Sequence, residues 1–133
     1  MAIFQFDNRT LSYEVRLAPL AGFDLLLLHG KRFSSSFWSP VLLELEARVS
    51  GGGGRVVTCD WPTQGAADPE YLARWLRTLG LVDVHVVAFD DAVELISGVQ
   101  RLDHSLIKKT LYYPQGGPKG DALVRAVFDF AGI

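Results

Sequence analysis

The chain has 133 residues, enough for one domain of ordinary size. Hydrophobic residues make up 49% of it and charged residues 21%, which fits a globular protein and excludes a disordered or fibrous one. The net charge of -2 at pH 7, with no basic run, gives no attraction for nucleic acid or an anionic membrane surface. We therefore expect a single domain over residues 1–133 that binds neither.

The N-terminal region predicts an antiparallel hairpin followed by a central strand. Residues 3–6 and 11–17 alternate in polarity or are rich in β-formers, and residues 8–10 between them predict a turn. Residues 23–28 are apolar except for Asp24 and are closed by His29-Gly30, a pattern typical of a strand covered on both faces in a parallel sheet.

A helix is predicted next, with Ser39 as its N-cap before Pro40. Its apolar residues fall on one face: Trp38, Val41, Leu42, Leu45 and Val49. The glycines at 51–54 predict the end of this helix and a flexible link. They do not predict a phosphate-binding loop, because no Gly-Lys-Ser/Thr follows them.

The rest of the chain predicts further strands that alternate with helices. The expected strands cover residues 55–61, 84–89 and 106–113, and the expected helices run from Asp68-Pro69 to Gly80, over 92–102 and over 121–131. This order predicts an α/β fold, a mostly parallel sheet with helices on both faces in three α/β/α layers. In such sheets, sites lie beyond the carboxyl ends of the strands.

Two features concern the cellular compartment. The first ten residues lack the basic start and long apolar stretch of a signal peptide, and apolar runs such as Leu25 to Leu28 are far too short to cross a bilayer. The one cysteine, Cys59, lies in an apolar run and is interpreted as a small buried hydrophobe. We expect a cytoplasmic protein that does not contact a membrane.

Four segments resemble the first half of the α/β-hydrolase fold in order and spacing: LLLLHG at 25–30, DWPTQG at 60–65, LGL at 79–81 and HVVAFDDAVEL at 85–95. The resemblance covers nearly the whole chain and implies an α/β-hydrolase-like N-terminal half. In that family, a sharp turn between strand and helix carries the nucleophile in a G-x-S-x-G motif. Here the motif reads AFDDA, with small flanking residues and with Asp90 at the nucleophile position.

The resemblance also implies roles for neighbouring residues. Family members with aspartate at the elbow, such as haloalkane dehalogenases and epoxide hydrolases, attack carbon with the carboxylate. Oxyanion-hole-like binding positions are implied at His29, Gly30, Lys31 and Asp91, although the charge of Asp91 would oppose a developing negative charge. Asp60 is expected to organise its own turn.

The histidines do not fit the family's catalytic position. A hydrolase of this type needs a histidine after its last strand, and this chain stops before that point. His29 matches the oxyanion loop, His85 lies in the strand before the elbow, and His104 falls near the end of the following helix. We therefore expect a hydrolase-like domain without hydrolase activity that binds a small molecule or a partner.

Two alternatives remain. The chain could be a minimal ester, epoxide or haloalkane hydrolase that uses Asp90 with groups borrowed from another chain. It could also be a half-enzyme completed by a separate polypeptide. No metal and no cofactor is expected, because the spacing of the acids around the elbow matches no cation loop: Asp83, Asp90, Asp91 and Glu94.

The C-terminal region predicts self-association. The strand at 106–113 is expected to leave an open sheet edge, and such edges tend to pair with another chain. The last helix is apolar on more than one side, so Val127, Phe128 or Phe130 should remain available to a neighbour. We expect a homodimer through the last strand or the terminal helix.

Overall fold

A computed structural model describes residues 2–30, 33–48, 53–63, 65–113 and 117–133. Six strands form one sheet in the order β1-β2-β4-β3-β5-β6. Their bounds are β1 Ala2–Phe6, β2 Arg9–Ala18, β3 Leu25–Leu28, β4 Gly54–Asp60, β5 His85–Phe89 and β6 Lys109–Tyr113. The helices are the 3-10 helix η1 Ser35–Trp38, then α1 Ser39–Ala47, α2 Pro69–Leu79, α3 Ala92–Leu102 and α4 Gly120–Ala131.

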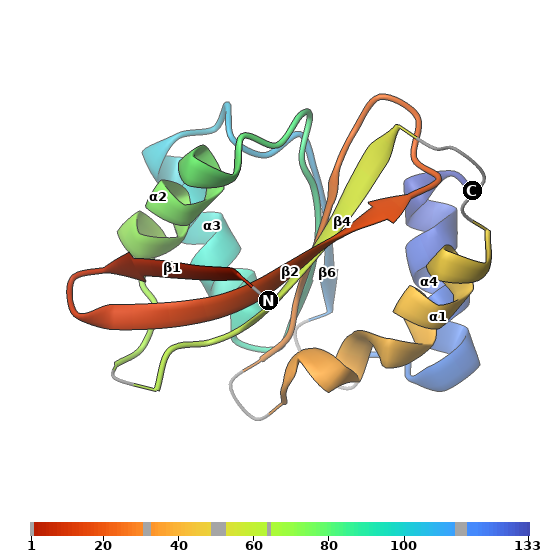
Figure 1. Cartoon of the computed structure of the whole chain (residues 1–133), viewed down its shortest axis with the longest axis horizontal. Helices are drawn as coiled ribbons and strands as arrows, with labels where there is room; N and C mark the ends of the chain where they lie inside the picture. Colours follow the sequence, from red (N-terminus) through yellow and green to blue (C-terminus); the bar gives the residue numbers. More distant parts are fainter. Residues whose placement is uncertain (1, 31–32, 49–52, 64, 114–116) are drawn as a thin grey trace.

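The sheet is mixed, with its parallel part toward the C-terminal side of the chain. β1 and β2 are antiparallel to each other, and β2 is antiparallel to β4. β3 pairs in parallel with β4 and β5, and β5 pairs in parallel with β6. Helices α2 and α3 cover one face of the sheet and α1 and α4 cover the other (Figure 1), which confirms the predicted three layers.

The core consists of one apolar cluster on each face of the sheet. The cluster under α2 and α3 includes Leu26, Leu28, Tyr71, Trp75 and Ile96. The cluster under α1 and α4 includes Leu25, Leu27, Trp38, Leu45 and Val127. Consecutive leucines of β3 point to opposite faces, so an unbroken apolar run is what a strand between two helical layers requires.

The hairpin turn lies earlier than predicted. Asp7 and Asn8 form a two-residue connection with φ values of 54° and 59°, so Arg9 already belongs to β2 and pairs with Phe6. Two consecutive left-handed residues match the twist of the flanking strands, and Asp and Asn tolerate this conformation.

The start of α1 also differs from the prediction. Ser39 is the first residue of α1 and has helical backbone angles, so it does not cap the helix. The chain enters α1 directly from η1, which places Trp38 at the N-cap position. Val49 and the glycines at 51 and 52 lie outside the described residues.

Helix α2 has the predicted ends. The Asp68 side chain accepts a hydrogen bond from the backbone N-H of Tyr71 at 2.8 Å, which satisfies one of the donors left free at a helix start. Gly80 ends the helix in the left-handed conformation with φ 63°.

The burial of α4 corrects the expectation for the terminal helix. Val127 is 0% exposed and Phe128 is 5% exposed, and Phe130 is half-buried against the ring of His85. The helix packs both on the sheet and on α1, so two of its sides are buried within the chain itself. Val127 and Phe128 are therefore not available to a partner.

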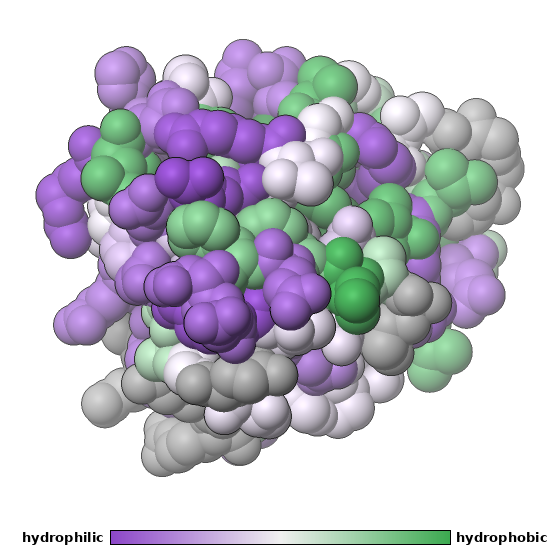
Figure 2. Space-filling model, turned by 60° about the vertical axis from the view of Figure 1, so that its left-hand side comes forward, coloured by the Kyte–Doolittle hydropathy of each residue, from purple (hydrophilic) through white to green (hydrophobic). Residues whose placement is uncertain are grey.

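The visible surface contains no broad apolar face. Figure 2 shows the side of the molecule on the left of Figure 1, where hydrophilic residues predominate and hydrophobic ones form small separate groups. Large exposed hydrophobic side chains come from several elements: Ile3, Val15, Leu17, Leu43, Val82 and Leu102. No helix in the described ranges is both long enough and apolar enough to cross a bilayer.

Candidate functional site

The turn between β5 and α3 holds Asp90 in a left-handed conformation, with φ 58°. Its backbone N-H donates to the carbonyl of Tyr113 at the end of β6, at 2.9 Å. Its own carbonyl accepts from the N-H of Val93 at 3.2 Å, in the first turn of α3. The chain thus reverses sharply at Asp90, as a strand-turn-helix elbow requires.

Gly30 lies directly against this elbow. A Cβ at residue 30 would be 2.6 Å from the Asp90 Cβ, 2.8 Å from Asp90 Oδ2 and 2.9 Å from Asp91 Oδ1. The two carboxylate oxygens are therefore less than about 6 Å apart, a distance at which like charges influence each other. Only a residue without a side chain fits between them, which explains glycine at this position.

His29 is part of the same loop and is almost completely buried, at 1% exposed. Its carbonyl accepts a hydrogen bond from Trp61 Nε1 at 2.8 Å, and its Nδ1 has no partner among the described residues. Burial lowers the pKa of the imidazole, while the nearby charges of Asp60 and Asp91 act in the opposite direction. Burial therefore favours the uncharged form of the ring. Lys31 lies outside the described residues.

Asp60 connects two loops at the carboxyl end of the sheet. Its carboxylate accepts from the backbone N-H of Ser35 at 2.8 Å and from the Ser35 hydroxyl at 3.0 Å. The sequence prediction that Asp60 organises its own turn missed this partner, which lies 25 positions away in η1.

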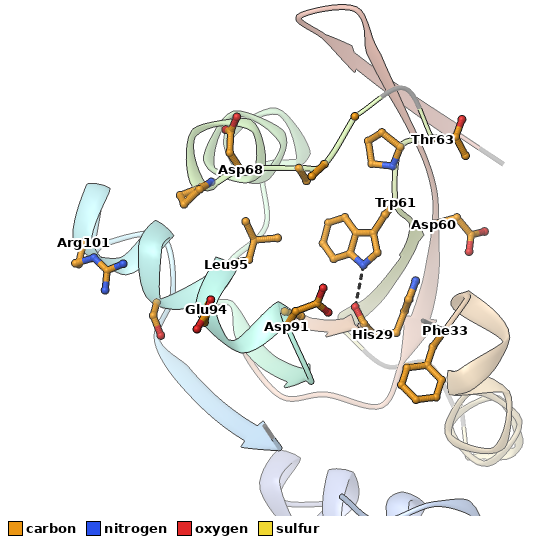
Figure 3. A pocket seen from close by; sticks show the side chains of 17 residues that line it. His29, Phe33, Asp60, Trp61, Thr63, Asp68, Asp91, Glu94, Leu95 and Arg101 are labelled. Atoms are coloured by element: carbon orange, nitrogen blue, oxygen red, sulfur yellow. Dashed lines mark hydrogen bonds between the residues drawn. The ribbon is translucent and has the colours of Figure 1, made fainter. Parts of the chain in front are cut away.

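A cleft of about 1070 Å³ opens beside the elbow, between the loop after β4, the start of α2 and one face of α3 (Figure 3). Its size is near the upper end of the usual range for small-molecule sites. The lining residues include His29, Phe33, Asp60, Trp61, Asp91, Glu94, Leu95 and Arg101. The described lining contains Asp91 but not Asp90.

The sequence prediction brought His29 and Asp91 to this site but missed Trp61, Glu94, Leu95 and Arg101. The sequence held a partial signal for the three helical residues. Glu94, Leu95 and Arg101 lie three, four and ten positions after Asp91, so they share one face of a helix with it. Which segment this face would meet was not visible in the sequence. Figure 3 shows Trp61 on the opposite side of the cleft from Leu95.

The other histidines lie away from the elbow. His85 begins β5, about 16 Å from Asp90 at 3.3 Å per residue, and its ring packs edge-on against Phe23. His104 is exposed and lines a separate pocket of about 280 Å³ with Asp83 and Lys108, at the amino ends of β5 and β6. Within the described ranges, no three His, Cys, Asp or Glu side chains are grouped to hold a metal.

No family model and no curated protein matches the sequence. Solved structures do match. The α/β-hydrolase enzyme MGS-M2, from a Medee basin deep-sea metagenome library, aligns with a TM-score of 0.65 and 14% identity over 84% of this chain and 43% of its own. The haloalkane dehalogenase DatA from Agrobacterium tumefaciens C58 aligns with a TM-score of 0.66 and 15% identity, over 85% and 40%.

A third match includes almost the whole chain. The thioesterase domain from the curacin biosynthetic pathway aligns with a TM-score of 0.61 and 18% identity, over 98% of this chain and 53% of its own. The chain thus spans about half or less of the length of these proteins. At such low identities the likeness concerns the fold alone. The chain therefore has the α/β-hydrolase fold, over part of the length of those enzymes.

Proposed function

We propose that this chain is an α/β-hydrolase-like domain that binds a small molecule in its cleft and does not hydrolyse it through Asp90. The observation that carries this proposal is the composition of the cleft wall, which contains Trp61, Leu95 and Asp91 but, among the described residues, not Asp90. An apolar pocket with a few polar groups is the usual form of a small-molecule site.

The positions of the histidines support the lack of hydrolysis. An ester formed on a carboxylate needs a base that activates water for the second step. His85 lies at the far end of β5, and His104 lies near the amino ends of the strands. His29 follows β3 and not the last strand of the sheet, so it does not occupy the position of the family's catalytic histidine.

Binding can be tested through the indole N-H signals in ¹H–¹⁵N spectra. Trp61 Nε1 is hydrogen-bonded to His29 and lines the cleft, whereas Trp38 and Trp75 are fully buried elsewhere. We expect members of a fragment library to shift the Trp61 signal and leave the other two unchanged.

A charged side chain placed in the cleft provides the matched variant. Leu95→Arg should abolish the fragment-induced shift of Trp61, because it fills the space opposite the indole. Leu43→Arg places the same charge on α1, where Leu43 is 66% exposed, and should leave the shift intact. The proposal would be contradicted if no fragment shifted the Trp61 indole signal, or if fragments shifted it equally in both variants.

One observation favours the alternative, a minimal hydrolase acting through Asp90: the left-handed backbone at this strand-to-helix turn. The test compares the wild type with Asp90→Asn and Asp90→Ala on activated esters, epoxides and haloalkanes, with intact mass recorded at each step. We expect no turnover and no adduct. A covalent adduct that disappears in both variants would establish Asp90 as the nucleophile.

We also propose that a second copy of the chain pairs with β6. This strand lies at the end of the sheet order and pairs only with β5 among the described strands. Unpaired strand edges favour association. Sedimentation velocity at tens of micromolar should show a dimer. A monomer throughout would contradict this, and a complex with a different co-purified chain would favour completion by another polypeptide.

A further inference from the structure

The outer edge of β6 keeps hydrogen-bonding groups that no described strand uses. β6 is the last strand in the sheet order and pairs with β5 alone among the described strands. The Tyr113 carbonyl accepts from the Asp90 N-H, so the peptide groups of Tyr113 are directed toward β5. Successive residues of a strand direct their peptide groups to opposite edges, so those of Leu111 also face β5, whereas those of Thr110 and Tyr112 face outward.

The outward-facing segment is short and has defined ends. Lys108, just before the strand, donates its N-H to the Val84 carbonyl, so it is engaged on the β5 side. At the other end, residue 114 is proline and has no N-H to donate. The N-H and C=O groups of Thr110 and Tyr112 are therefore the ones that another strand can use.

The side chains of β6 leave this edge open. The Tyr112 hydroxyl donates to Oε1 of Gln100 on α3 at 2.8 Å, so the ring folds onto the α2/α3 face of the sheet. The Tyr113 ring packs on Phe89 on the other face, with 4.9 Å between the ring centroids. A Cβ at residue 117 would lie 2.7 Å from the Phe89 ring and 2.8 Å from the Tyr113 Cβ. At Gly117 the chain is therefore on the α1/α4 face and not along the edge.

A second copy of the same strand complements this edge when the two strands run antiparallel about a two-fold axis at Leu111. Thr110 of each copy then lies opposite Tyr112 of the other, and both of these pairs exchange hydrogen bonds between N-H and C=O groups. An axis at Thr110 or at Tyr112 would form only one complete pair of this kind. The Leu111 register also places Lys109 of each copy opposite Tyr113 of the other, which keeps the two lysines apart.

We propose that two copies of the chain join through β6 in this register, as antiparallel strands with the Leu111 side chains in contact at the two-fold axis. The two sheets then continue into each other, with the α1/α4 layers of both copies on the same side. The inference rests on the proposed pairing of a second copy with β6, and it specifies the geometry of that pairing.

Single cysteines along β6 test the register. Leu111→Cys should form an intermolecular disulfide under mild oxidation, because residues facing each other at such an axis have Cα atoms about 4.5 Å apart. Thr110→Cys and Tyr112→Cys should not, because each of these residues would lie about 8 Å from its own copy. Non-reducing gels separate the products. The buried Cys59 is present in every variant, so the wild type gives the background.

A proline tests the hydrogen bonds independently. Thr110→Pro removes an N-H that faces outward, so the ladder between β5 and β6 should remain intact. Dimerisation should weaken by about ten-fold or more in sedimentation velocity, because the bond is lost at both symmetry-related positions. Thr110→Val keeps the N-H and a side chain of similar shape, and it should dimerise as the wild type does.

The outcomes separate this register from the proposed dimer. If Thr110→Cys or Tyr112→Cys cross-links in place of Leu111→Cys, two copies pair at β6 but the register is wrong. If the protein is a dimer and no cysteine on β6 cross-links, the interface lies elsewhere and both the register and the β6 dimer are overturned. A wild type that remains monomeric overturns both as well, whereas the binding of small molecules is measured separately through Trp61.

Discussion

Gly30 and Asp90 are in van der Waals contact across the carboxyl end of the sheet, so closely that a Cβ on residue 30 would lie 2.6 Å from the Cβ of Asp90. Gly30 follows β3, and Asp90 follows β5, the neighbouring strand. The contact fixes the position of the loop after β3 against the elbow, and it depends on the absence of a side chain at residue 30.

Gly30→Ala should therefore destabilise the protein by about 1–3 kcal/mol, because the added methyl group forces the loop or the elbow to move. Urea unfolding measures the change. Gly53→Ala is the matched control, since a Cβ there would meet no described atom within 4 Å. Equal stability of the two variants would contradict the contact.

The left-handed backbone of Asp90 predicts an unusual order of stabilities. Asp90→Ala and Asp90→Gly both remove the carboxylate, but only glycine adopts φ 58° without strain. Asp90→Gly should be more stable than Asp90→Ala by about 1 kcal/mol. At Glu94, inside α3, the order should be reversed by a similar amount, since alanine favours helix more than glycine. Thermal unfolding of the four variants checks both orders.

Asp24, just before β3, connects the start of β4 to the loop before β5 at the opposite end of the sheet. Its carboxylate, 3% exposed, accepts from the backbone N-H groups of Arg55 and Val82 at 2.9 and 2.8 Å and from the Arg55 guanidinium at 3.0 Å. We expect Asp24→Ala to cost about 2–4 kcal/mol, because buried donors lose their partner.

The control for Asp24 is Glu14→Ala, which removes the carboxylate of the surface pair with Arg16. Surface pairs contribute about 1 kcal/mol or less. Denaturant unfolding of both variants makes the comparison, and a loss at Asp24 no larger than at Glu14 would show that the carboxylate is dispensable.

Stability should fall as the pH falls through about 6.5. Burial lowers the pKa of both His29 and His85, and Lys109 lowers that of His85 further. A histidine with a lowered pKa in the folded state takes up its proton more readily when unfolded, so its stabilising effect is present above the unfolded pKa and is lost below it.

Unfolding free energies at pH values between about 7.5 and 5.5 measure this effect. His29→Gln and His85→Gln should each reduce the slope, whereas His104→Gln removes an exposed imidazole and should not. Each substitution also changes the packing around a buried ring. The unfolding free energy of each variant is therefore compared with the value for the same variant at the upper pH. If the double variant His29→Gln/His85→Gln keeps the wild-type slope, these two histidines do not cause the pH dependence of stability.

Much of the fold could be predicted because it depends on local patterns. The apolar run of β3, the cap at Asp68 and the stop at Gly80 each have a physical cause within a few residues. The start of α1 could not be predicted in the same way. It follows η1, which is held by the contact of Ser35 with Asp60, far along the chain.

The candidate site was only partly predictable for the same reason. The elbow at Asp90 is a local turn, and its small neighbours are visible in the sequence. The cleft wall combines Trp61, which follows β4, with Leu95 and Arg101 from α3, and their proximity depends on the packing of these segments. The burial of Val127 and Phe128 likewise depends on the packing of α4 on α1.

The rim of the parallel sheet is tied together by a series of contacts outside the strand ladder. Trp61 donates to the His29 carbonyl, Gly30 packs on Asp90, and the Asp90 N-H donates to the Tyr113 carbonyl. These contacts link the ends of β4, β3, β5 and β6 in the order in which the strands lie side by side. A residue at the cleft wall is thus joined to the outermost strand through contacts at the ends of four adjacent strands.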